Sequence, residues 1–277
     1  METVTDWLKL WRELVSMKIG MSDRKNAMQL DDYWRKKAER FKSKKGKKQS
    51  DPGSSLTFIA STLKSNPDST LLDIGAGAGD WSEFLAPYAK KVTALEPSDF
   101  MGELITEKIT DGNIENIELV KGSWPAIDIE PHDYTLASHS MYTETEFQPF
   151  IDKMVETSRK GCFLVLKTLF LDTVMAKASE RILGQPYDSP CLQIAFNALH
   201  QMGIYPNVVM ESGKSWKPWS NDLLDDALLD IKRRFGILNT SDHDDFLVSL
   251  LESELIEKDG KYIWPNGVGS ALVYWDV

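Results

Sequence analysis

The sequence predicts an α/β fold built on a parallel sheet, and three observations support this prediction. From Thr70 onward, short apolar runs alternate with segments of helical periodicity, which is the pattern of β–α–β units. The first apolar run ends in a turn that contains Gly75, Gly77 and Gly79. The second run ends in an acid, Glu96. Because the carboxyl ends of parallel strands meet at one edge of a sheet, we expect a ligand site there.

The expected elements follow one another in a regular order. Two helices come first, within residues 1–53, and a Lys-rich stretch with a Pro-Gly break separates them from the rest. Strands are predicted at Thr70–Ile74, Lys91–Leu95, Ile117–Lys121, Tyr134–Ser138, Cys162–Lys167, Val208–Met210 and Ala271–Trp275. Helices are predicted at Ser54–Leu63, Trp81–Ala89, Asp99–Ile109, Phe147–Ser158 and Pro190–Met202.

A long segment separates the last two predicted strands. It contains helical patterns at Asn221–Phe235 and Asp242–Glu257, and a structureless loop of this length is implausible in a compact domain. We therefore expect three parts. They are an N-terminal helical lid in residues 1–53, a ligand-binding core in residues 54–215 plus 267–277, and a helical insertion in residues 216–266.

Composition and charge favour a soluble globular protein. The 277 residues are 42 % hydrophobic and 27 % charged, which is ordinary for this class. No apolar run reaches the roughly 20 residues of a membrane span, and no signal-peptide pattern is present, so we expect a cytoplasmic location. Residues 1–50 hold 14 basic and 7 acidic residues, against 18 and 35 in the remainder. Such an acidic body disfavours broad contact with nucleic acid.

Two classes of ligand share this arrangement of turn and acid. A dinucleotide site requires G-x-G-x-x-G, but Asp80 occupies the position of the third glycine and Gly79 comes one residue early. A dinucleotide would also place its pyrophosphate near Asp73 and Asp80. S-adenosylmethionine carries a sulfonium and an ammonium group instead, so nearby acids are favourable. The residues therefore favour S-adenosylmethionine, with an NAD(P)-dependent oxidoreductase as the alternative.

Three segments resemble successive motifs of class I S-adenosylmethionine-dependent methyltransferases. They are Leu71–Gly79, Val92–Ser98 and His132–Ser140, and the resemblance extends over about residues 55–215 and the final strand. It implies a Rossmann-like sheet of seven strands whose last strand runs antiparallel to its neighbours. The two strands that flank the insertion would then be the final pair of the sheet.

The resemblance also implies a set of cofactor-binding residues. These are Asp73, Gly75, Ala76, Gly77, Glu96, Pro97, Met101, Ser123, Trp124 and Ser138. The turn Gly75–Gly77 would lie against the methionine part of the cofactor, and Asp73 would orient the turn and help to hold the amino group. Glu96 would accept hydrogen bonds from the ribose hydroxyls.

The adenine end departs from the pattern of the family. Family members often have an acid after the third strand, whereas this chain has Ser123 and Trp124. Ser123 would offer a weaker hydrogen bond, Trp124 would stack on the base, and Met101 would pack near it.

The acceptor side rests on residues after the fourth strand and before the core. His139 and Tyr142 are the candidate catalytic residues, as a general base or as acceptor contacts, with a structural role as the alternative. In similar small-molecule methyltransferases the segment before the core closes over the cofactor. Tyr33 and Trp34 would then face the sulfonium, with plain packing as the alternative. No metal site is expected.

These features predict an enzyme that transfers a methyl group from S-adenosylmethionine to a small-molecule acceptor by in-line displacement. The chain lacks the Asn/Asp-Pro-Pro-Tyr/Phe signature of many enzymes that methylate base or amide nitrogens, so a nucleic-acid partner is not expected. Two alternatives stay open. One is a protein or RNA methyltransferase that docks its acceptor through the Lys-rich stretch 42–48, and the other is a cofactor-binding regulatory protein without catalysis.

Overall fold

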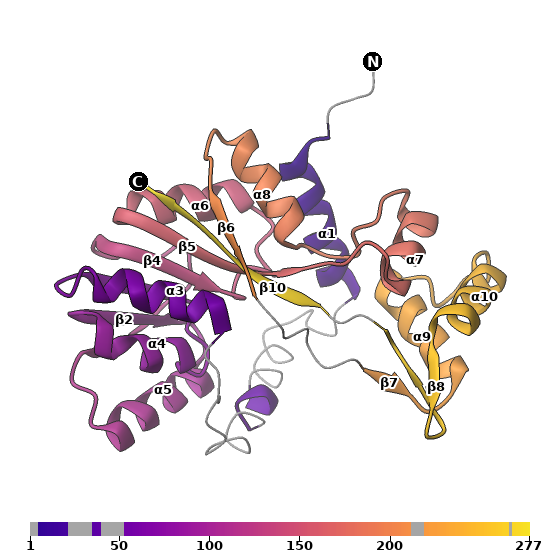
Figure 1. Cartoon of the computed structure of the whole chain (residues 1–277), viewed down its shortest axis with the longest axis horizontal. Helices are drawn as coiled ribbons and strands as arrows, with labels where there is room; N and C mark the ends of the chain where they lie inside the picture. Colours follow the sequence, from indigo (N-terminus) through magenta and orange to yellow (C-terminus); the bar gives the residue numbers. More distant parts are fainter. Residues whose placement is uncertain (1–4, 22–34, 40–52, 212–218, 266–267) are drawn as a thin grey trace.

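A seven-stranded sheet forms the centre of the molecule (Figure 1). The computed structural model describes residues 5–21, 35–39, 53–211, 219–265 and 268–277. The strands are β1 (Thr70–Ile74), β2 (Lys91–Glu96), β3 (Ile117–Lys121), β4 (His132–Ser138), β5 (Ser158–Thr168), β6 (Asn207–Met210) and β10 (Gly269–Asp276). Their order is β3-β2-β1-β4-β5-β10-β6, and β10 is antiparallel to both of its neighbours. The predicted Rossmann-like sheet with an antiparallel last strand is confirmed.

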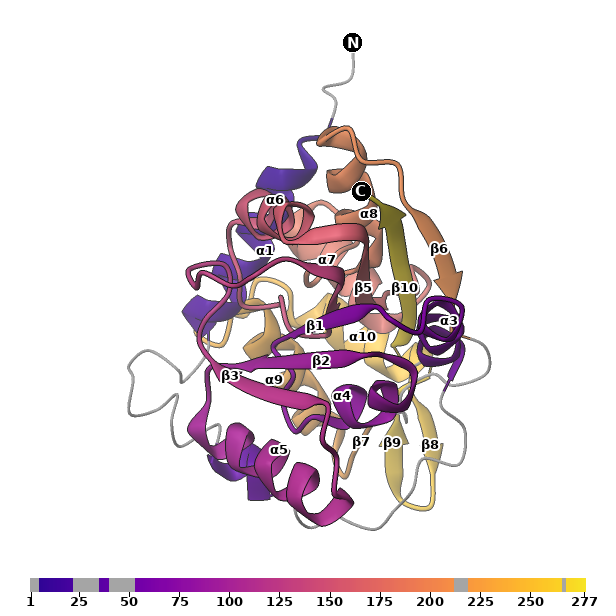
Figure 2. The same ribbon diagram turned by 90° about the vertical axis from the view of Figure 1, so that its left-hand side faces the viewer.

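Helices cover both faces of this sheet (Figure 2). One face carries α3 (Gly53–Lys64), α4 (Asp80–Leu85) and α5 (Asp99–Gly112), and the 3₁₀ turn η1 (Ala86–Tyr88) follows α4. The other face carries α1 (Trp7–Met21), α6 (Phe147–Glu156) and α8 (Leu192–Gln201). Because side chains alternate along a strand, Leu71 packs toward the first helical layer and Leu72 toward the second. Continuous apolar runs in the strands follow from this two-sided burial.

The first helix is a layer of the core. Trp11 is fully buried, its ring nitrogen donates to the Glu144 carbonyl at 2.8 Å, and its ring centroid lies 4.8 Å from that of Phe147. Arg12 donates to both carboxylate oxygens of Glu146, at 2.8 and 2.7 Å. α1 therefore packs in the core, and the lid expected over residues 1–53 stays a prediction. Residues 35–39 form a short helix, while Tyr33, Trp34 and the stretch 42–48 lie outside the described residues.

A second, smaller body stands beside the sheet (Figure 1). It comprises α7 (Val174–Leu183), α9 (Leu224–Phe235), α10 (Asp244–Glu254) and a small sheet of β7 (Ser220–Asn221), β9 (Lys261–Ile263) and β8 (Ile256–Lys258). The helices share a buried cluster that includes Ile231, Leu247 and Trp264. Two helices of the insertion match the prediction with trimmed ends. The sequence pattern did not predict α7 or the small sheet.

None of the helices among the described residues is long and apolar enough to cross a membrane.

Candidate functional site

The glycine turn after β1 has two different steric requirements. Gly75 has φ of +70°, and a Cβ placed on it would lie 2.6 Å from the Cβ of Ser140. Gly77 has φ of +58°, and a Cβ placed on it would meet nothing within 4 Å. The amides of Gly75 and Ala76 both donate to the Leu95 carbonyl, at 2.8 and 3.0 Å. Gly75 therefore permits close packing, whereas Gly77 faces open space that a ligand can enter.

Glu96 lies beside this turn at the end of β2. It is 4 % exposed, and its two carboxylate oxygens accept the N–H groups of Gly77 at 2.8 Å and Ser98 at 2.9 Å. Burial raises the pKa of Glu96, and these backbone hydrogen bonds oppose that shift. A carboxylate oxygen can accept a second hydrogen bond. The fixed carboxylate thus offers an acceptor on each oxygen to a pair of neighbouring hydroxyls.

Asp73 is buried in the core beneath the turn. It is 1 % exposed, and the Ser82 hydroxyl of α4 donates to it at 2.6 Å. Burial raises the pKa of Asp73 to about 6. This bond joins β1 to α4 across the turn, which suits the predicted role of Asp73 in orienting the turn.

Ser140 lies across from the turn, in the segment after β4. Its hydroxyl is buried and has no hydrogen-bond partner among the described residues. Such a group costs about 1–3 kcal/mol unless something satisfies it. The side chain lies against Gly75, where a ligand of the turn would supply the missing partner. Nothing in the sequence distinguishes Ser140 from its polar neighbours.

His139 and Tyr142 are brought together by a chain of hydrogen bonds. The Lys167 amide donates to the Tyr142 hydroxyl at 2.6 Å, and this hydroxyl lies 2.9 Å from Nδ1 of His139. Nε2 of His139 lies 3.2 Å from the hydroxyl of Ser270 in β10. His139 also has φ of +52°, a region that non-glycine residues seldom adopt. Both ring nitrogens therefore have partners within the protein.

The protonation states of this pair follow from burial. Burial, with help from the charge of Lys167, lowers the pKa of His139 to about 4. Burial raises the pKa of Tyr142 above its ordinary value. At neutral pH the imidazole is neutral and the phenol keeps its proton, so Tyr142 donates to Nδ1 and Nε2–H donates to Ser270. In this arrangement the pair forms a rigid wall of the site.

The residues predicted for the adenine end lie in different surroundings. Met101 is fully buried and packs with Ala38, Ala78 and Leu104, which places the helix of residues 35–39 behind the glycine turn. Trp124 donates to the Phe150 carbonyl at 3.2 Å and packs against the α6 side of the core. The remaining predicted contacts are exposed or half-buried: Ser123, Pro97 and Ser138.

Asp80 shares one cation with a second acid. Its carboxylate pairs with the Lys108 ammonium at 2.5 Å, and the same ammonium contacts Glu83 at 2.6 Å. The two carboxylates and one ammonium keep a net negative charge beside the turn, which agrees with the sequence argument against a pyrophosphate. Within the described residues, no group of three or more His, Cys, Asp or Glu side chains is placed to hold a metal ion.

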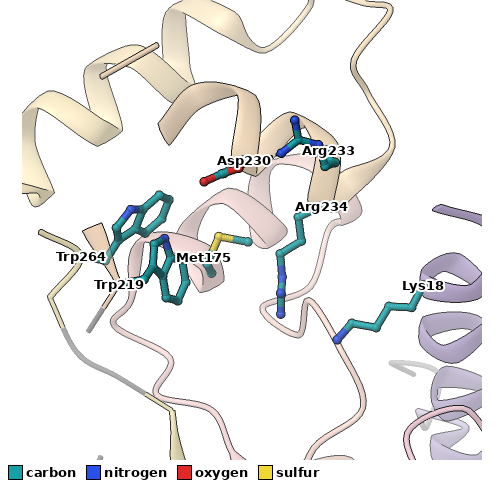
Figure 3. A pocket seen from close by; sticks show the side chains of 7 residues that line it. All are labelled: Lys18, Met175, Trp219, Asp230, Arg233, Arg234 and Trp264. Atoms are coloured by element: carbon teal, nitrogen blue, oxygen red, sulfur yellow. Dashed lines mark hydrogen bonds and ion pairs between the residues drawn. The ribbon is translucent and has the colours of Figure 1, made fainter. Parts of the chain in front are cut away.

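A cavity of about 400 Å³ lies between α1, α7 and the insertion (Figure 3). The residues that line it are Lys18, Met175, Trp219, Asp230, Arg233, Arg234 and Trp264. Its volume is typical of small-molecule sites. Lys18, which lines it, interacts with Lys167 of β5, and the Lys167 ammonium lies 5.1 Å from the Tyr142 ring centroid.

Comparison with known proteins decides between the two ligand classes. Residues 71–161 match the family described as "Methyltransferase domain". The chain contains a class I methyltransferase domain. S-adenosylmethionine is the methyl donor of this class, and the open space at Gly77, the fixed acceptors of Glu96 and the unpartnered Ser140 hydroxyl fit it. Sequence recognition of the family is confirmed.

Similarity to known proteins covers more of this chain in structure than in sequence. A probable ribosomal RNA small subunit methyltransferase A of Methanosarcina acetivorans is 32 % identical over 34 % of this chain and 35 % of its own length. The corresponding protein of Methanosphaera stadtmanae is 25 % identical over 44 % of each. The chain thus spans less than half the length of these curated relatives. A putative methyltransferase of Bacillus halodurans superposes with a TM-score of 0.52 at 14 % identity, over 80 % of this chain and 97 % of that one.

Proposed function

We propose that the whole chain is an S-adenosylmethionine-dependent methyltransferase that acts on a small molecule held in the cavity between α1, α7 and the insertion. The observation that carries the proposal is the cavity itself, whose volume of about 400 Å³ suits a small acceptor. Lys18 of its lining interacts with Lys167 at the end of β5, and the Lys167 amide donates to Tyr142 in the segment that follows β4.

The cofactor and the protein have separate tasks in this reaction. Bound S-adenosylmethionine supplies an electrophilic methyl carbon, to which the acceptor's lone pair forms a bond while the carbon–sulfur bond breaks and its electron pair stays on sulfur. The protein's task is alignment and exclusion of water. Glu96 and the glycine turn hold the donor, and the wall of His139 and Tyr142 separates the two ligands from the core. Because the nitrogens of His139 have protein partners, we assign the pair to positioning rather than to proton abstraction.

A ribosomal RNA acceptor is the second candidate, favoured by the sequence likeness to the archaeal relatives. Against it stand the acidic balance outside residues 1–50, with 18 basic and 35 acidic residues, and the absence of the Asn/Asp-Pro-Pro-Tyr/Phe signature. The segment after β4 has Ser138, His139 and Ser140 where that signature would stand.

One labelling experiment separates these candidates. The protein is incubated with S-adenosylmethionine labelled in the methyl group and a cell extract divided into small-molecule, RNA and protein fractions. We expect the label in the small-molecule fraction, and none with a Gly77→Ala variant. Label in RNA or protein would overturn the choice of acceptor. Tight binding of S-adenosylhomocysteine without transfer to any fraction would indicate a non-catalytic protein.

A further inference from the structure

Three cations from separate parts of the fold converge beside the cavity. Lys18 comes from α1, Lys167 from β5 and Arg234 from α9, and Asp188 before α8 is the carboxylate among them. Arg234 donates to Asp188 through Nε. Lys167 donates to the Ser189 hydroxyl at 2.5 Å, and that hydroxyl donates to the second oxygen of Asp188 at 3.0 Å. Each oxygen of the Asp188 carboxylate therefore accepts a hydrogen bond from within the protein.

The positive charge of this group exceeds its negative charge. Asp188 is 2 % exposed and balances one cation. This leaves one net positive charge while Lys18 is neutral and two when Lys18 is protonated. Among the described residues, Lys18 has no carboxylate within ion-pair distance, and the terminal nitrogens of Arg234 donate to no protein acceptor. Arg233 does not change this balance, because it pairs with Asp230 at 2.9 Å. Uncompensated charge in a partly buried place is costly, so an anion that enters the cavity gains from both cations.

The shape of the cavity adds an apolar wall opposite the cations. Figure 3 shows Lys18 and Arg234 reaching toward one another from α1 and α9, with Met175, Trp219 and Trp264 to the side. The two indoles lie 4.6 Å apart between ring centroids; Trp264 is buried behind, and Trp219 is 41 % exposed. A guanidinium offers two parallel N–H groups to a carboxylate or a phosphate. Apolar and anionic parts of one ligand would both find partners here.

We propose that this cavity binds an organic anion, whose carboxylate or phosphate group lies between Lys18 and Arg234 and whose apolar body lies against Trp219 and Met175. The assignment of this anion as the methyl acceptor rests on the proposed function. The binding of the anion does not, since it depends on residues of the cavity alone.

Protonation of Lys18 supports this site. Burial, together with the charges of Lys167 and Arg234 and a hydrogen bond with Lys167, lowers the pKa of Lys18 to about 6, and Asp188 opposes this shift. Asp230 and Arg233 are the other charged groups that line the cavity. A bound anion favours the charged form of Lys18 and is accompanied by proton uptake. The affinity for the anion should therefore fall as the pH rises above about 6.

The test measures binding of four probes to the full chain by calorimetry. The probes are benzoate, phenyl phosphate, inorganic phosphate and the neutral benzamide. We expect benzoate or phenyl phosphate to bind at least tenfold more tightly than benzamide, and the stronger of the two identifies the acidic group. Inorganic phosphate should bind more weakly than phenyl phosphate, because it lacks the apolar body. Equal binding of benzamide and benzoate, or no binding of either organic anion, would overturn the proposal.

Matched variants assign the binding to these residues. Lys18→Met should lower the affinity for the preferred anion about tenfold, the loss typical of one charged hydrogen bond, while leaving the Arg234–Asp188 pair intact. Arg234→Lys keeps the charge but not the paired N–H groups, and should also weaken binding. Lys9→Met removes a charge from the exposed part of the same helix and should change nothing. Unchanged anion affinity in a folded Lys18→Met protein would refute the site. Titration with S-adenosylhomocysteine is run in parallel. If S-adenosylhomocysteine does not bind while the organic anion does, the proposed function is contradicted and the anion site is not.

Discussion

At the scale of single residues, the donor site depends on groups that the fold fixes before any ligand arrives. Glu96 is held by two backbone N–H groups, and Ser140 keeps a buried hydroxyl without a partner among the described residues. Glu96 can be recognised in the sequence from its place at the end of the second predicted strand. Ser140 cannot, because its hydroxyl is buried against Gly75, a residue that is distant in sequence. Sequence reasoning thus predicts the residues of the motif better than the residues that pack against it.

Replacement of Glu96 tests the ribose contact. Glu96→Gln should weaken binding of S-adenosylhomocysteine by about 1.5–3 kcal/mol, because hydrogen bonds to a carboxylate are replaced by weaker ones to an amide. Calorimetry measures the effect. Glu118→Gln is the matched control, since Glu118 is an exposed acid of the neighbouring strand that pairs with Lys91 at 2.5 Å. Equal affinity of the Glu96→Gln and wild-type proteins would contradict the assignment.

Removal of the Ser140 hydroxyl separates binding from stability. Because this hydroxyl has no partner among the described residues, Ser140→Ala should leave the free energy of unfolding unchanged or raise it. Binding of S-adenosylhomocysteine should nevertheless weaken by about 1 kcal/mol, since the ligand loses a hydrogen bond. Urea unfolding and calorimetry on the same variant provide the two values. A loss of stability with full affinity would show that the hydroxyl serves the fold alone.

The buried His139 predicts a specific acid sensitivity. Its pKa is lowered from 6.5 to about 4, so the unfolded chain binds more protons than the folded one between these values, and stability falls as the pH falls through them. The full effect is about 3 kcal/mol. His139→Asn, which tolerates the positive φ, should remove this part of the pH dependence. Asp73, whose pKa is raised, contributes to the pH dependence of stability in the opposite direction. This contribution is the same in both proteins and cancels in the comparison. Parallel stability curves of the two proteins would contradict the assigned burial.

At the scale of elements, the chain was predictable where it forms long or strongly patterned segments. All seven strands of the main sheet were expected near their observed places. The five inner strands are buried and have continuous apolar runs, while the edge strands β3 and β6 are more exposed. The small sheet was not expected, since β7 has two residues and β8 and β9 have three, too few for a period to show. The contact of Lys18, Lys167 and Arg234 was also beyond prediction, because it joins three elements that are far apart in sequence.

The second body around α7, α9 and α10 has its own core. We therefore predict that a mutation in this core destabilises the second body without destabilising the main sheet. Ile231 is fully buried there, so Ile231→Ala should cost about 2–5 kcal/mol within that body. Amide hydrogen exchange should increase in α9 and α10 but not in β1 or β2. Affinity for S-adenosylhomocysteine should stay near that of wild type. Ile194→Ala in α8 is the comparison, because its side chain belongs to the core of the main sheet. Equal acceleration of exchange in both bodies would contradict the separation.

At the scale of the whole molecule, the glycine turn and the cavity are formed by different parts of the fold. The donor turn lies at the ends of β1 and β2, and the cavity with its cations lies between α1 and the second body. The hydrogen bonds of His139 and Tyr142 run from the end of β4 to β5 and β10. Under the proposed function, the methyl-donor core would serve an acceptor selected by the added helices.

The central claim is that the glycine turn binds S-adenosylmethionine, and calorimetric titration with S-adenosylhomocysteine tests it most directly. Gly77→Ala places a methyl group in the open space at φ of +58°. Gly203→Ala introduces the same methyl at φ of +80°, also with nothing within 4 Å, away from the site. We predict one bound ligand per chain in the wild-type and Gly203→Ala proteins and at least a tenfold loss of affinity in Gly77→Ala. Binding of NADH in place of S-adenosylhomocysteine, or equal affinities in the two variants, would contradict the account.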